Sequence, residues 1–267
     1  MTRIIVVTSG KGGVGKTTTT ANIGAALAKF GKRVALVDAD FGLRNLDLLL
    51  GLENRVVYTA IDVINGDCRL EQALIKDRRN PKLMLMPASQ SRDKTAVSAE
   101  QMGELIDRLA SHFDYILIDC PAGIEQGFQN AIVKANEAII VTTPDISAVR
   151  DADRVIGLLE AGQIYQTHLV LNRIRPEMVH SNTMMSVDDV REILSIPLIG
   201  TIPEDEDVIV STNNGEPMVT SLEPTYAGVA FTNVAQRLEG HKVPFVDLTY
   251  NDNFMARFKR FISTLSN

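Results

Sequence analysis

Short apolar runs alternate with longer segments of helical periodicity along this chain of 267 residues. Most runs are rich in β-branched residues and carry few polar positions, which is typical of strands buried on both faces of a parallel sheet. This alternation predicts an α/β fold, a doubly wound, mostly parallel sheet with helices on both faces. The predicted strands are Ile4–Thr8, Val34–Asp38, Leu83–Pro87, Tyr115–Asp119, Ala138–Thr142, Leu169–Asn172 and Leu198–Ile202.

The segments between these runs have the spacing of amphipathic helices. One of them begins with Ser186, a candidate N-cap followed by acidic residues that favour the helix dipole. Two loop-rich stretches, Phe41–Leu52 and Lys76–Lys94, are candidates for mobile or partner-facing segments. The predicted helices are Thr18–Phe30, Ala99–Phe113, Gln126–Ala135, Ala148–Ala161 and Ser186–Leu194.

The first predicted strand leads into a glycine-rich loop, Gly-Lys-Gly-Gly-Val-Gly-Lys-Thr, at residues 10–17. Between a strand and a helix this is a complete phosphate-binding motif, because loop N–H groups and the helix N-terminus converge on phosphate oxygens. We expect Lys16 to neutralise the β- and γ-phosphates and the Thr17 hydroxyl to bind Mg²⁺. The predicted nucleotide-binding residues here are Gly10, Lys11, Gly12, Gly13, Val14, Gly15, Lys16, Thr17 and Thr18.

Acidic residues end two other predicted strands. Asp119 closes the run Tyr-Ile-Leu-Ile-Asp, which predicts a carboxylate that reaches Mg²⁺ opposite Thr17, or alternatively one that caps the next turn. Asp38 and Asp40 are two positions apart and point the same way on an extended chain. We expect both to face the phosphates, one ordering lysines and one orienting the attacking water; the alternative is a pair of solvated loop acids.

The residues after two late strands predict a pocket for the base. Asn172 can both donate to and accept from a purine edge, and Pro203 with Asp205 would form a second wall. The chain lacks the Asn-Lys-x-Asp motif at this strand end, which favours ATP over GTP. Cys120 is small and is interpreted as filling space rather than acting as a nucleophile.

Composition narrows the class of protein. The net charge of −6 and pI near 5.3 argue against a body built mainly to bind nucleic acid. Two cysteines, Cys68 and Cys120, are too few for a disulfide scaffold and favour the cytoplasm. No stretch approaches 18 apolar residues, and the first strand follows Met1 too closely for a signal peptide.

Three motifs together resemble those of the deviant Walker A (MinD/ParA) family of P-loop ATPases: Lys11–Thr17, Asp38–Asp40 and Asp119–Gly123. The family includes septum-placement, DNA-partition and flagellar-number ATPases and nitrogenase iron protein. The chain is most similar to the septum-placement branch, over essentially its whole length. That similarity includes Asp40–Asp47, Val149–Arg154 and the C-terminal tail.

The resemblance implies roles for several residues. Lys11 would reach across an ATP-bound homodimer to the partner subunit's phosphates, Asp40 would orient the hydrolytic water, and Asp151 would hold Lys11 while the subunits are apart. It also implies an Mg²⁺-dependent ATPase that recruits the division inhibitor MinC to the membrane and is released when MinE stimulates ATP hydrolysis. Cys120 departs from the family, in which serine is more common.

From Asn253 onward the chain has no acidic residue and places aromatic and aliphatic side chains along one side of a helix. This profile is typical of a helix in a membrane interface, where each basic residue adds about 1 kcal/mol near an anionic leaflet. The alternative is a terminal helix docked on the domain itself or on a partner. The predicted membrane-contacting residues are Phe254, Arg257, Phe258, Lys259, Arg260, Phe261, Ile262 and Leu265.

We therefore predict an ATPase domain at 1–240, a linker at 241–252 and an amphipathic membrane-targeting helix at 253–267. The expected location is the cytoplasm and, as a peripheral protein, the inner face of the cell membrane. One short helix binds reversibly, whereas two in an ATP-bound dimer gain avidity. The alternatives are a DNA-partition ATPase, disfavoured by the acidic balance and the apolar tail, and a flagellar-number ATPase, which usually has an N-terminal extension.

Overall fold

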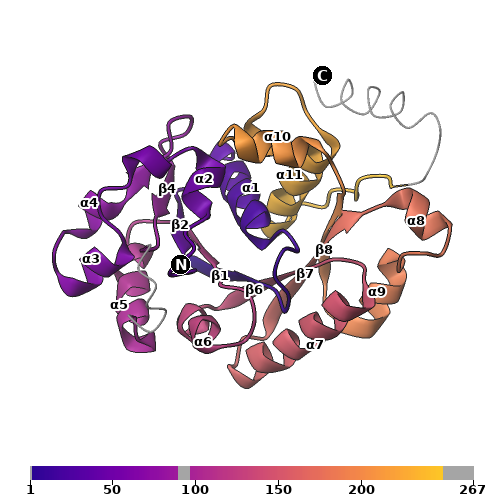
Figure 1. Ribbon diagram of the computed structural model, residues 1–267, viewed down its shortest axis with the longest axis horizontal. Coiled ribbons are helices and arrows are strands. Elements are labelled where there is room, and N and C mark those ends of the chain that lie inside the picture. The colour runs from indigo at the N-terminus through magenta and orange to yellow at the C-terminus, as the bar shows by residue number, and fades with distance from the viewer. Residues whose placement is uncertain (1, 90–96, 249–267) are drawn as a thin grey trace.

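The computed structural model describes residues 2–89 and 97–248. In this part of the chain one eight-stranded sheet has the order β3-β4-β2-β5-β1-β6-β7-β8, parallel except for the antiparallel pair β3–β4 (Figure 1). The strands are β1 Arg3–Thr8, β2 Val34–Asp38, β3 Ile75–Lys76, β4 Leu83–Met86, β5 Tyr115–Asp119, β6 Glu137–Thr142, β7 Gln166–Ile174 and β8 Leu198–Pro203. The predicted fold class is confirmed.

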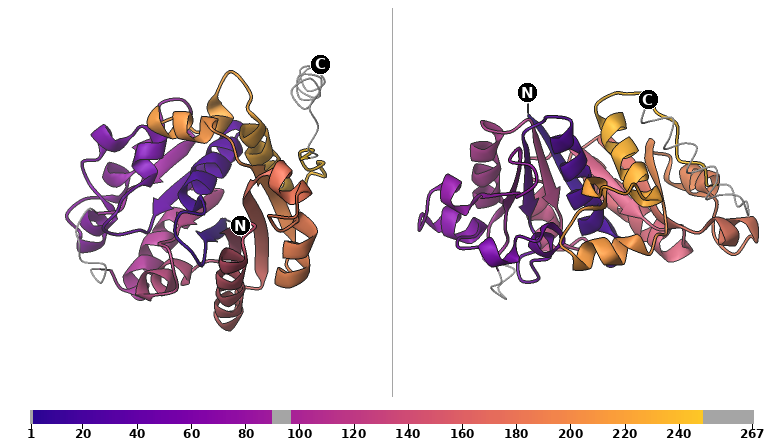
Figure 2. Two further views of the ribbon diagram at one scale, coloured as in Figure 1. Left: turned by 45° about the vertical axis from the view of Figure 1, so that its right-hand side comes forward. Right: turned by 90° about the horizontal axis from the view of Figure 1, so that it is seen from above.

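Helices cover both faces of the sheet, so its central strands are buried on two sides (Figures 1 and 2). On one face α1 and α11 lie side by side, with α2 beside α1 and α10 in contact with α2. On the other face lie α5, α6, α7 and α9. The bounds are α1 Lys16–Lys29, α2 Leu46–Leu50, α5 Ala99–Ala110, α6 Gln126–Ile132, α7 Ile146–Ala161, α9 Val187–Leu194, α10 Asp207–Asn213 and α11 Tyr226–Leu238.

Three short helices lie near the ends of the sheet: α3 Ala60–Asn65 and α4 Leu70–Ala73 beside β4, and α8 Pro176–His180 after β7. Single 3₁₀ turns span Glu53–Arg55 and Met218–Thr220. None of the described helices has both the length and the apolar character needed to cross a bilayer.

The sheet separates two apolar cores, as the alternation of side chains along each strand requires. Along β1, Val6 packs in the core beneath α5, α6 and α7, whereas Ile5 and Val7 pack in the core beneath α1 and α11. All three side chains are fully buried. The apolar runs thus predicted their strands because both faces of each strand are covered.

Two elements differ from the sequence-based expectations. The stretch Phe41–Leu52 is not all loop, because Leu46 and Leu50 are buried in the core beneath α1 and α11 and form α2, which ends at Gly51 with a φ of 64°. The helix α11 was not predicted, although it supplies a large part of one core. Its apolar side chains are mostly alanine and valine, but its sequence is about as amphipathic as that of α7, so the pattern for this helix is present in the sequence.

The segment after α11 is held against the domain. The Arg237 guanidinium donates to the carbonyl oxygens of Ile199 at 2.8 Å and Val243 at 3.1 Å, and it lies 3.9 Å from the centre of the Phe245 ring. The first part of the predicted linker, 241–248, therefore packs on the domain. Its remainder and the predicted terminal helix at 253–267 lie outside the described residues, so these domain boundaries stay a prediction.

The predicted N-cap at Ser186 is confirmed and gives a test of local stability. Its Oγ accepts from the Asp189 N–H at 3.1 Å, and the Asp189 carboxylate accepts from the Ser186 N–H at 2.8 Å. We expect Ser186→Ala to lower the free energy of unfolding by about 1 kcal/mol in urea denaturation, because helix α9 loses this cap. Asp188→Asn is the control: it keeps the cap, removes an exposed ion pair with Arg191 and one first-turn charge, and should lower the free energy of unfolding by less, about 0.5 kcal/mol.

Candidate nucleotide site

The glycine-rich loop joins β1 to α1 and leaves the start of that helix open. Gly13 and Gly15 have φ of 78° and 94°, a backbone conformation that favours glycine. Gly15 is the N-cap of α1, no side chain caps the helix, and its first turn holds no acidic residue. The first N–H groups of α1 and its positive dipole end are thus available to an anion such as phosphate.

Two glycines of the loop allow close approach of other segments. A Cβ atom on Gly10 would overlap the backbone of Asp151 in α7, and one on Gly15 would overlap the side-chain amide of Asn172 at the end of β7. The Asn172 Nδ2 atom donates to the Val14 carbonyl oxygen at 2.8 Å. The loop is therefore clamped between α7 and β7, which fixes the direction of its N–H groups.

Asp119, at the end of β5, lies under the start of α1 and is buried. The Thr20 hydroxyl donates to its Oδ1 atom at 3.1 Å. Burial raises the pKa of the Asp119 carboxyl, while the charge of Lys16 and hydrogen bonds from Thr17 and Thr20 lower it. The structure thus brings Lys16, Thr17 and Asp119 together as the motifs predict. Thr20 was not predicted. It lies three residues after Thr17 and therefore on the same side of α1, which is the sequence feature that could have indicated it.

Asp38 lies beside Asp119, because the two residues are partners in the register of β2 and β5. Its carboxylate is buried and accepts from the N–H groups of Asp40 at 3.0 Å and of Asn45 and Leu46 at 3.2 Å each. Burial, and then the charge of Asp119, raise the pKa of Asp38 to about 7. Asp38 thus binds the backbone of the loop after β2. The catalytic role predicted for it stays a prediction.

Asp40 lies near the same centre, since its charge raises the pKa values of Asp119 and Cys120. Cys120 is fully buried, and burial raises the pKa of its thiol to about 12. A buried neutral thiol is a poor nucleophile, which confirms its interpretation as a space-filling side chain.

Lys11 is half-exposed, and the structure corrects its expected partner. Its Nζ atom donates to the Ser147 hydroxyl at 2.9 Å and lies 3.7 Å from the Asp145 carboxylate, at the start of α7. Asp151 instead pairs with Arg154 at 3.7 Å. The reason is geometric: Asp151 brings its backbone, not its carboxylate, against the loop at Gly10, whereas Asp145 is the N-cap of α7.

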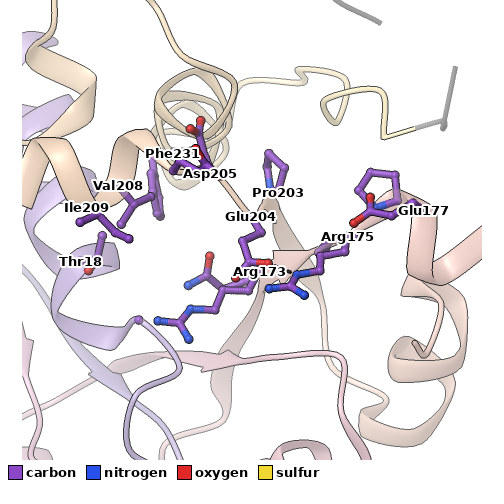
Figure 3. Close-up of a pocket in the computed structure, with 15 residues that line it drawn as sticks. Thr18, Arg173, Arg175, Glu177, Pro203, Glu204, Asp205, Val208, Ile209 and Phe231 are labelled. Carbon is purple, nitrogen blue, oxygen red and sulfur yellow. Dashed lines mark hydrogen bonds and ion pairs between the residues drawn. The ribbon is translucent and has the colours of Figure 1, made fainter. Parts of the chain in front are cut away.

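A cavity of about 590 Å³ adjoins the loop, in the size range of small-molecule sites (Figure 3). The structure brings the predicted base-pocket residues Asn172, Pro203 and Asp205 together here, alongside Gly15 and Thr18. The Asp205 carboxylate also accepts from the backbone N–H groups of residue 207, at 3.0 Å, and residue 227, at 3.2 Å. It therefore supports the starts of α10 and α11 as well as the cavity wall.

Other cavity residues were not predicted from the sequence. Arg173 follows Asn172 with a φ of 56°, and Arg175 is hydrogen-bonded to Glu204 across the end of the sheet (Figure 3). Phe231 lines the cavity from α11, the helix that was not among the predicted ones. Only the folded chain brings these residues to the phosphate loop.

The residues around Asp119 fit a divalent cation. Two adjacent buried carboxylates, Asp38 and Asp119, concentrate negative charge next to the Thr17 hydroxyl. Within residues 2–89 and 97–248, no group of three or more His, Cys, Asp or Glu side chains could hold a metal. A cation here would need phosphate oxygens or water to complete its coordination, as Mg²⁺ does in nucleotide sites. This geometry is that of a P-loop nucleotide-binding protein.

Comparison with known proteins narrows this class. A family model described as the CobQ/CobB/MinD/ParA nucleotide binding domain matches residues 5–218. The septum site-determining protein MinD of Synechocystis sp. is 60% identical over 261 residues, which are 97% of this chain and 98% of that protein. A chain of the MinC:MinD cell division protein complex from Aquifex aeolicus is 48% identical, with a TM-score of 0.84 and coverage of 91% of this chain and 98% of that one.

A further solved structure is MinD complexed with Mg-ADP from Pyrococcus horikoshii, 33% identical with a TM-score of 0.81, covering 90% of this chain and 96% of that one. The chain therefore belongs to the CobQ/CobB/MinD/ParA family of nucleotide-binding domains and, within it, to the MinD septum site-determining proteins. The family resemblance drawn from the motifs is confirmed.

The buried carboxylate pair predicts how stability changes with pH. Because the pKa of Asp38 is raised from 3.8 to about 7, its contribution to folding is full below about pH 4 and is lost as the pH rises to 7. Without nucleotide and Mg²⁺, we expect the wild type to lose about 2 kcal/mol more than Asp38→Asn between pH 5 and pH 7. Urea denaturation at the two pH values measures this, and equal losses in both proteins would contradict it.

Proposed function

We propose that this chain is an Mg²⁺-dependent ATPase that dimerises with ATP, attaches to the inner face of the cell membrane and places the division septum by recruiting MinC. MinE-stimulated hydrolysis then releases it. The observation that carries the proposal is the convergence of the open start of α1, Lys16, Thr17 and buried Asp119 at one point. The MinC:MinD complex and the Mg-ADP complex of similar proteins support the partner and the cofactor.

The residues of this chain have distinct tasks in hydrolysis. The loop N–H groups and Lys16 bind the phosphates, and Thr17 with Asp119 would hold Mg²⁺, which supplies charge neutralisation during phosphoryl transfer. Asp40, next to this centre, would orient the attacking water. Asp38 keeps the loop that carries Asp40 in place through its hydrogen bond to the Asp40 N–H.

The surroundings of Lys11 support an ATP-dependent dimer. Its ion pair with Asp145 joins side chains that are 48% and 49% exposed, and such a pair contributes only about 0–1 kcal/mol. Lys11 can therefore leave it at small cost to reach a partner subunit's phosphates. The apolar side chains of Leu43, Ile124 and Ile146 are exposed and belong to the segments after β2 and β5 and to the start of α7, which suits a face covered by another subunit.

Membrane attachment is proposed from the sequence pattern of 253–267. The test is co-sedimentation of the full chain with anionic liposomes, neutral liposomes or duplex DNA, each with ATP or ADP and Mg²⁺. We expect retention on anionic liposomes with ATP only, because two weak helices joined in a dimer gain about 10²–10⁴ in avidity. Lys16→Ala should abolish this retention together with tight ATP binding.

A matched pair of tail variants separates membrane contact from added charge. Phe261→Glu should release the protein from liposomes with unchanged ATP affinity, whereas Ser263→Glu, with the same charge on the polar side, should retain more binding. Retention on DNA with none on liposomes would instead indicate a partition ATPase. Absence of phosphate release from ATP with Mg²⁺, anionic liposomes and MinE would contradict the proposed activity.

A further inference from the structure

A second cavity, of about 490 Å³, lies far from the phosphate loop in the fold. It is bordered by the residues that immediately precede β2, β4 and β5, among them Arg33, Lys82 and Phe113. In a parallel sheet these amino ends lie at the edge opposite the carboxyl ends, where the phosphate loop and Asp119 are found. Helix α4 and the short strand β3 complete its wall beside β4. We call it the β4-edge pocket.

The floor of the β4-edge pocket is apolar. Leu70 and Phe113 are buried members of the core beneath α5, and Leu74 and Met84 are half-buried and pack against that core. Helix α4 has four residues and β3 has two, too few to cover this corner of the sheet. The apolar core therefore opens to solvent at this point.

The rim of the pocket is cationic. Arg33, Lys76 and Lys82 are exposed around it, and Glu71 is the one acidic residue in its lining. The rim is therefore positively charged, although the net charge of the whole chain is −6.

Two of the rim cations are held by contacts within the domain. The Arg33 guanidinium pairs with Asp114 at 2.7 Å, and the Lys82 Nζ atom donates to the Gly31 carbonyl oxygen at 2.9 Å. Lys76 stands directly opposite Met84 in the antiparallel register of β3 and β4, so both side chains lie on one face of the sheet. A cation thus lies next to the open part of the apolar floor.

We propose that the β4-edge pocket binds a fatty acid, with the acyl chain on the apolar floor and the carboxylate paired with Lys76. Burial of the acyl chain on this floor removes apolar surface from water, and the cationic rim is complementary to one anionic head group. The cavity volume lies in the range of small-molecule sites. The pocket lacks the glycine-rich loop of a phosphate site, which separates it from the nucleotide site.

Photo-crosslinking of the full chain tests this site directly. The probe is a dodecanoic acid with a diazirine in its chain, used below its micelle concentration, with labelled peptides mapped by mass spectrometry. We expect labels within residues 70–84 and at 112–113, equally with and without ATP. Unlabelled dodecanoate should compete at least tenfold better than dodecyltrimethylammonium, which has the same chain and the opposite charge.

Variants locate the head group and the chain. Lys76→Glu should reduce labelling of residues 70–84 at least tenfold, and Leu74→Gln should reduce it as well. Arg191→Glu makes the same change of charge at an exposed position of α9 and should leave the labelling of residues 70–84 unchanged. Labelling confined to 253–267, equal competition by the cationic amphiphile, or undiminished labelling of Lys76→Glu would each overturn the proposal. These results do not depend on ATP hydrolysis or dimerisation, so they stand apart from the proposed function.

Discussion

Two carboxylates, Asp38 and Asp119, are buried side by side at the carboxyl ends of β2 and β5, and the nucleotide site is arranged around them. Burying like charges together is unfavourable unless each is compensated. Asp119 is compensated by Lys16 and by hydroxyl groups of α1, and Asp38 by three backbone N–H groups. The start of α1 and the loop after β2 are therefore both tied to this pair, and a cation bound there would relieve the remaining charge.

Much of the fold could be predicted because its central strands are covered on both faces and so read as uninterrupted apolar runs. The same reasoning does not find elements that are too short to show a pattern or whose burial depends on distant parts of the chain. The strand β3 has only two residues and is too short for any pattern. Helix α2 forms because Leu46 and Leu50 are buried in the core beneath α1 and α11, which no local sequence preference reports.

The candidate site likewise has a part that the sequence predicts and a part that it does not. Residues 10–17 and Asp119 were predictable because a local motif carries their chemistry. The contacts that orient them come from distant segments: Asn172 binds the Val14 carbonyl oxygen across 158 positions, and Thr20 meets Asp119 across 99. Asp151 shows the limit of the family resemblance, since the residue was placed at the loop correctly but with its backbone, not its carboxylate, in contact.

Two surface segments are linked to the nucleotide site by a few short contacts each. The loop after β2 depends on the Asp38 carboxylate and includes Arg44, whose φ of 36° is unfavourable for a side chain with a Cβ atom. Helix α7 is linked through the contact of Gly10 with Asp151 and the exposed pair of Lys11 with Asp145. Any change in charge at Asp38 and Asp119 therefore acts on the first segment through hydrogen bonds, and any movement of the phosphate loop acts on the second. A nucleotide bound at the loop would act on both segments, so two separate surfaces would respond to one site.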